Sequence, residues 1–83
     1  MITDLYNIKK EYLKKLTDNI LKQEKYSNIT KLNAKNNSKI SNVSDLTKLQ
    51  VLKASGKYCG IDQVGIEGLN LVELNAIDNS TIT

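Results

Sequence analysis

The chain has 83 residues, which limits it to one small domain with a modest buried core. Its twelve basic residues are all lysines, the net charge is +3, and the absence of arginine argues against specific reading of nucleic acid. With no histidine and one cysteine, Cys59, it lacks an internal disulfide, the usual zinc ligand sets and the nucleophile–histidine pairs of hydrolases. We therefore expect no cofactor and no enzymatic activity.

The first segment, residues 1–27, is expected to form an N-terminal capping helix spanning residues 4–25. Its apolar residues recur at steps of three or four, as on one stripe of an amphipathic helix, at Leu5, Ile8, Tyr12, Leu16 and Ile20. Thr3 or Asp4 is the expected N-cap. The opposite face carries Lys9, Lys10, Lys14 and Lys15. Such a face can contact acidic lipid or a nucleic-acid backbone, but interspersed acidic residues favour an ordinary solvated helix face.

The second segment, residues 28–83, repeats one phrase three times. The copies begin Ile29-Thr-Lys-Leu32-Asn-Ala34, Leu49-Gln-Val-Leu52-Lys-Ala54 and Leu71-Val-Glu-Leu74-Asn-Ala76, and each leads to an isoleucine 21 residues from the next: Ile40, Ile61 and Ile82. A fixed period in this range is typical of a solenoid, in which each unit buries its apolar face only against its neighbours. The last copy stops part way, which favours a fragment of a longer array.

Within each copy, the fourth and sixth residues alternate with polar ones, which predicts a short strand. Equivalent strands are expected to pair in parallel, with three columns of side chains pointing outward. These columns are Lys31, Val51 and Glu73; Asn33, Lys53 and Asn75; and Lys35, Ser55 and Ile77. The return segments 40–46 and 61–69 are expected to form short helical or 3₁₀ turns, with Val43, Leu46, Val64, Ile66 and Leu69 facing the core.

This phrase resembles the leucine-rich repeat family, whose pattern is L-x-x-L-x-L-x-x-N/C-x-L. The resemblance implies an α/β solenoid of about three coils with a parallel sheet on its concave face. It also implies that Asn37 and Asn79 bond the main chain where each strand turns away. The middle copy holds Lys57 at that position, so we expect an interrupted ladder there.

The resemblance further implies a non-enzymatic protein–protein interaction module whose concave face, formed by the nine outward residues, binds an unidentified protein. The alternative is a structural or self-assembling role, in which the uncapped C-terminal coil forms a homo-oligomer. Cys59 is interpreted as a turn cysteine that packs as a small apolar residue. The sequence shows neither a signal peptide nor a transmembrane segment, which favours a cytoplasmic location.

Overall fold

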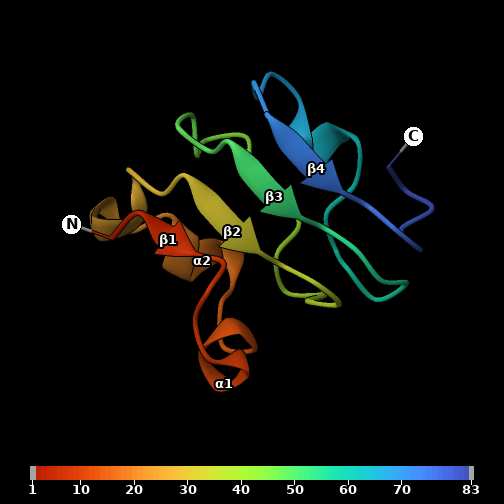
Figure 1. Ribbon diagram of the computed structural model, residues 1–83, viewed down its shortest axis with the longest axis horizontal. Helices are drawn as coiled ribbons and strands as arrows, with labels where there is room; N and C mark the ends of the chain where they lie inside the picture. Colours follow the sequence, from red (N-terminus) through yellow and green to blue (C-terminus); the bar gives the residue numbers. More distant parts are fainter. Residues whose placement is uncertain (1, 83) are drawn as a thin grey trace.

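The computed structural model describes residues 2–82 and contains one four-stranded parallel sheet with short helical segments (Figure 1). The strands are β1 (Asp4–Leu5), β2 (Lys31–Asn33), β3 (Val51–Lys53) and β4 (Glu73–Asn75). They lie side by side in chain order, so each connection leaves the sheet and returns to start the neighbouring strand. The expected α/β class with a parallel sheet is confirmed.

The strand register agrees with the repeat. Leu5, Leu32, Leu52 and Leu74 pair across the four strands, as do the residues before them, and Asn33, Lys53 and Asn75 pair across the last three. Because side chains alternate between the two faces of a strand, this register aligns all four leucines on one face. The apolar spacing of the phrase therefore determines which residues are neighbours in the sheet.

The hydrophobic core lies behind the sheet and is built from aliphatic side chains of successive repeats. Ile29, Leu32, Ile40, Leu49, Leu52 and Ile61 are fully buried. Leu74 is the exception, because it is 39% exposed whereas its neighbour Leu52 is 1% exposed. β4 is the edge of the sheet, so no further described strand covers Leu74. The interior is therefore well packed from β1 to β3 and partly open at β4.

The prediction of a single helix over residues 4–25 is wrong. This segment instead contains β1, two short helices, α1 (Lys10–Leu13) and α2 (Asp18–Leu21), and the 3₁₀ turn η1 (Glu24–Tyr26). The helices lie near the β1 end of the sheet, and α2 is behind it (Figure 1). Leu5, Leu16 and Leu21 still reach the common core. These three leucines are thus buried from β1, from the turn after α1 and from α2 rather than from one helical stripe, and Tyr12 of that stripe is exposed.

Side-chain hydrogen bonds explain the interruption of the helix. Asp4 accepts the backbone N–H of Tyr6 at 2.7 Å, which turns the chain after β1. The hydroxyl of Thr17 accepts the N–H of Ile20 at 3.2 Å, so Thr17, rather than Thr3 or Asp4, is the N-cap of a helix. Residues with short polar side chains offer the backbone such alternatives to a continuous helix. Local capping therefore overrides the helical periodicity of this segment.

The return segments are more irregular than expected. Only η2 (Val64–Ile66), a 3₁₀ turn, forms in residues 61–69, and residues 40–46 form turns without a helix. Val43 and Leu46 are buried as expected, whereas Val64 is exposed. Gly65 accounts for the close approach here, because a Cβ at this position would lie 2.2 Å from the Ser41 carbonyl oxygen. η2 therefore packs through its glycine backbone instead of through Val64.

Two asparagine side chains, half-buried Asn37 and buried Asn79, hydrogen-bond to the main chain of the segment or repeat before them. The amide nitrogen of Asn37 donates to the carbonyls of Leu13 and Leu16 at 3.1 and 3.0 Å. Asn79 repeats the arrangement two repeats later, donating to the carbonyls of Ala54 and Ile61 at 2.8 and 2.9 Å. The expected main-chain role of these asparagines is confirmed.

Cys59, rather than Lys57, occupies the equivalent place in the middle repeat. Asn37 and Asn79 accept the N–H two residues ahead, from Lys39 and Thr81. The Cys59 sulfur likewise accepts the N–H of Ile61, and the side chain is buried while Lys57 is exposed. The extra residues of the middle turn therefore precede the column position. The column of these side chains is therefore not interrupted at Lys57 as expected: its position in the middle repeat is shifted two residues along the chain, to Cys59.

Candidate functional site

The outward side chains of the strands form the outer sheet face, which we define as Asp4, Lys31, Val51, Glu73, Asn33, Lys53 and Asn75. Lys31 and Glu73 are exposed, whereas Val51 and Lys53 are half-buried. The two expected columns within the strands are therefore neighbours, in the register predicted. The face combines cations, anions, amides and one aliphatic side chain, with no two like charges paired directly.

Asp4 extends the first column to a fourth strand. The hydrogen bond from the Tyr6 N–H has the largest effect on the Asp4 carboxylate and holds the pKa of Asp4 below its ordinary value. The N–H of Asn7 and the positive charge of Lys31 lower this pKa further. Asp4 is thus an anion paired in register with the cation Lys31. This gives the face a negative corner at β1 and another at β4.

The third expected column lies just past the strands, where the chain turns. The N–H of Asn36 donates to the Ser55 carbonyl at 2.9 Å, and that of Gly56 donates to Ile77 at 2.8 Å, so parallel pairing continues here. Lys35 is exposed and Ile77 is 68% exposed, but Ser55 is only 5% exposed. The expectation that the Ser55 side chain is exposed on the sheet face is therefore wrong.

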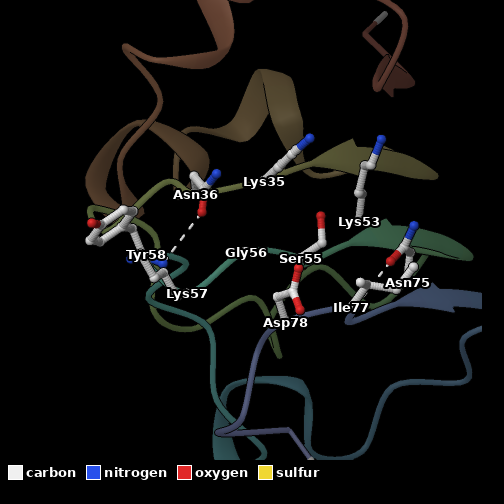
Figure 2. Close-up of a pocket in the computed structure, with 10 residues that line it drawn as sticks. All are labelled: Lys35, Asn36, Lys53, Ser55, Gly56, Lys57, Tyr58, Asn75, Ile77 and Asp78. Atoms are coloured by element: carbon white, nitrogen blue, oxygen red, sulfur yellow. Dashed lines mark hydrogen bonds between the residues drawn. The ribbon is translucent and has the colours of Figure 1, made fainter.

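The residues that follow this column share an unusual backbone conformation. Asn36, Gly56 and Asp78 have φ values of 54°, 93° and 63°. Left-handed φ is favourable for glycine and tolerated by Asn and Asp, which explains the residue types at this turn. A Cβ at Gly56 would lie 1.9 Å from the Asn36 side-chain oxygen, which accepts the Tyr58 N–H at 3.3 Å (Figure 2). The turns of neighbouring repeats thus interlock.

Two grooves lie at this end of the sheet. The larger, which we call the basic groove, has a volume of about 610 Å³ and is lined by Lys35, Asn36, Lys53, Ser55, Gly56, Lys57, Tyr58, Asn75, Ile77 and Asp78 (Figure 2). The smaller, the helix-side groove, has a volume of about 360 Å³ and is lined by Lys10, Leu13, Lys14, Asn33, Lys35, Asn36, Asn37, Ser38 and Lys39. Lys35 and Asn36 belong to both, so the grooves adjoin.

Tyr6 belongs to the outer side of the sheet, and sequence reasoning missed it. The Nζ of Lys53 lies 6.0 Å from the centre of its ring, and a further hollow is lined by Tyr6 together with residues 73–77 of β4 and the turn after it. The signal was present in the sequence, because Ile2-Thr-Asp-Leu5 matches Ile29-Thr-Lys-Leu32. It was obscured because Leu5 also fits the helical stripe.

The lysine face expected on the N-terminal helix does not exist as one surface, because the helix is interrupted. Lys10 and Lys14 instead turn toward the sheet and line the helix-side groove, while Lys9 and Lys15 line a separate apolar hollow with Ile8 and Tyr12. The sequence could not predict that two of these lysines join Lys35 and Lys39 at a groove beside the sheet.

Cys59 lies near these grooves but does not line them. Burial raises the pKa of its thiol, and the hydrogen bond from the Ile61 N–H lowers it by less. The thiol is therefore protonated at neutral pH, which disfavours nucleophilic chemistry. Among residues 2–82, no group of three His, Cys, Asp or Glu side chains is arranged to hold a metal ion.

The described part of the chain, residues 2–82, has no helix with the length and apolar character needed to cross a bilayer. The chain matches no protein-family model, and comparisons with curated proteins and with solved structures give no significant similarity. The grooves at the carboxyl end of the sheet and the outer sheet face are therefore the candidate site on the strength of their own geometry.

Proposed function

We propose that the chain is a short solenoid of the leucine-rich repeat type and that its outer sheet face binds a protein partner. The main support is the in-register stacking of the repeated phrase: equivalent residues of successive repeats are paired neighbours, so changes at outward positions alter the surface without disturbing the core. In a solenoid, such a sheet is the concave binding surface. No bond is made or broken in this function.

The surface chemistry supports a binding role. Val51 and Ile77 are partly or largely exposed among polar columns, and the Tyr6 ring lies over Lys53. Aromatic and aliphatic anchors surrounded by polar groups are typical of protein interfaces. A standard interface buries about 800 Å² per partner. The total accessible surface is 5424 Å², so such an interface would cover about a seventh of it.

The experiment compares two double variants that leave the net charge unchanged. Peptides are first selected from a displayed random library on the wild-type protein. The first variant, Lys53→Glu with Glu73→Lys, reverses the sign of two charges on the outer sheet face. The second, Lys22→Glu with Asp45→Lys, reverses the sign of two charges that line a hollow beside α2. We expect the first variant to bind the selected peptides at least about tenfold more weakly and the second to bind as wild type, with both circular dichroism spectra unchanged. Equal affinity of all three proteins would reject the outer sheet face as the site.

A second candidate function is self-assembly through β4, which the exposure of Leu74 favours. Asn75 and Ile77 accept hydrogen bonds from the β3 side, so by alternation the main-chain groups of Leu74 point to the open edge. An antiparallel pair centred on Leu74 would place Leu74 opposite its counterpart and Glu73 opposite Asn75 of the second copy. Parallel pairing of β4 with β1 of another copy would instead set Glu73 beside Asp4, a like-charge pair. A closed dimer is therefore the preferred assembly.

Sedimentation at several concentrations tests self-assembly. If it occurs, Leu74→Glu should abolish the dimer, while Val64→Glu, a matched change at another exposed apolar residue, should preserve it. A wild-type protein that stays monomeric up to the highest concentration would exclude this candidate and leave the binding function untouched.

A further inference from the structure

The basic groove contains a buried hydroxyl group without a partner. Ser55 Oγ has no hydrogen-bond partner among the described residues, although the residue is only 5% exposed. Figure 2 shows this hydroxyl directed to the outer side of the sheet, toward the space between Lys35 and Lys53. Buried polar groups are almost always paired, so an unpaired one in a groove needs an explanation. A hydrogen-bond acceptor on a bound ligand would pair with the Ser55 hydroxyl and provides that explanation.

The charge around this hydroxyl is strongly positive. The basic groove is lined by Lys35, Lys53 and Lys57, and the helix-side groove adds Lys10, Lys14 and Lys39. Asp78 is the one acidic residue in the two linings. Half of the twelve lysines of the chain therefore border one continuous surface at the carboxyl ends of the strands. Such a surface attracts an extended anion along its length.

The structure favours carboxylates of a polypeptide over phosphates of a nucleic acid. The cations are lysines, which lack the planar fork that reads the base edges of a nucleic acid. The exposed ring of Tyr58 has the Lys57 ammonium 5.1 Å from its centre, and the Tyr6 ring has that of Lys53 at 6.0 Å, so a cation already lies against one face of each ring that a base could use. Asp78 would repel a continuous phosphate backbone, but it can accept a peptide N–H.

We propose that the basic groove binds a carboxylate of an acidic polypeptide segment, which accepts a hydrogen bond from Ser55 Oγ between Lys35 and Lys53. The segment continues into the helix-side groove, where Lys10, Lys14 and Lys39 meet its further acidic side chains. The hydroxyl is shielded from water, so the side chains around it must shift as the carboxylate enters. This assignment rests on the proposed binding function and names the chemical class of the partner.

The test uses a synthetic twelve-residue peptide of alternating Glu and Ser and its Gln counterpart, with binding measured by calorimetry at low salt. The wild-type protein should bind the Glu peptide and not the Gln peptide, and the affinity should fall as salt rises. Ser55→Ala should weaken binding of the Glu peptide about tenfold, as expected for one hydrogen bond to a charged group. The matched variant Ser80→Ala, at an exposed residue outside both grooves, should bind as wild type.

Thermal unfolding separates binding from folding. Because Ser55→Ala removes an unpaired buried hydroxyl, its melting temperature should equal or exceed that of the wild type while its affinity falls. Equal affinity of the wild type and Ser55→Ala, or of the Glu and Gln peptides, would overturn the assignment. Tighter binding of a single-stranded oligonucleotide of equal charge would overturn the choice of partner class. If neutral peptides bind the outer sheet face and the Glu peptide does not, the inference fails while the proposed function stands.

Discussion

The Asn37 side chain connects the main chain of the N-terminal segment to the repeats, and Asn37→Ala should therefore be severely destabilising. Its amide nitrogen donates to the Leu13 and Leu16 carbonyls at 3.1 and 3.0 Å, and its oxygen accepts the Lys39 N–H at 2.9 Å. Each lost hydrogen bond costs about 1 kcal/mol, and more where a partner stays unpaired. We expect a loss of about 2–4 kcal/mol in the free energy of unfolding.

This loss is large for a domain of this size. At about 0.05–0.15 kcal/mol per residue, the whole chain has about 4–12 kcal/mol of stability. Each kcal/mol lowers the melting temperature of a small domain by about 4–8 °C. Urea unfolding followed by circular dichroism, together with a thermal melt, should therefore show a clear shift for Asn37→Ala.

Two further variants make the measurement specific. Asn19→Ala is the matched control, because Asn19 is exposed in α2 and makes no side-chain hydrogen bond among those described. Asn37→Asp keeps the size and the acceptor but replaces the donor, so it should cost at least as much at neutral pH and recover partly in acid, where the carboxyl group can donate. The reasoning is refuted if Asn37→Ala loses no more stability than Asn19→Ala.

Three other predictions concern single sites. Partial burial raises the pKa of Asp18, but the hydrogen bonds from Ser41 and Asn42 outweigh it and hold this pKa below its ordinary value. The Asp18 carboxylate therefore stabilises the fold above its unfolded pKa of about 3.9. That stabilisation is lost as the pH falls through the folded pKa. Urea unfolding at pH 2–7 should therefore show that the difference in stability between the wild type and Asp18→Asn becomes smaller in acid. A difference that stays constant with pH would contradict this role of Asp18. The buried thiol of Cys59, whose pKa is raised, should react with a thiol reagent far more slowly in the native protein than in urea, and equal rates would show that it is accessible. Gly56→Ala should cost more stability than Gly68→Ala, since both have positive φ but only a Cβ at Gly56 would meet a neighbour; equal losses would mean that Asn36 moves aside freely.

The sequence predicted the repeated part of the fold well. Leu32 and Leu52 are buried and paired, and the outward residues before and after them are neighbours, because a two-residue alternation leaves little freedom of register. The role of Asn37 and Asn79 was also predictable, since a short amide carries both donors and an acceptor. These properties depend on local spacing, which the sequence records directly.

Other features depended on competition between local and tertiary interactions. Residues 4–25 have a helical apolar period, but Asp4 and Thr17 cap turns instead, and Asn37 takes up carbonyls at the end of α1. The pattern of apolar residues cannot rank these hydrogen bonds against helical ones. For the same reason the pattern predicts that Leu5 belongs to a helix, although Ile2-Thr-Asp-Leu5 repeats the strand phrase.

By itself the sequence determined the strand phrase, its register and the aliphatic core, because these follow from residue spacing and side-chain size. Tertiary structure alone decided the composition of the candidate site. It buried Ser55 without a partner, laid Tyr6 over Lys53, and joined Lys10 and Lys14 to Lys35 across two elements. The physical reason is that these arrangements depend on how separate segments pack against one another, and a local pattern carries no information about that packing.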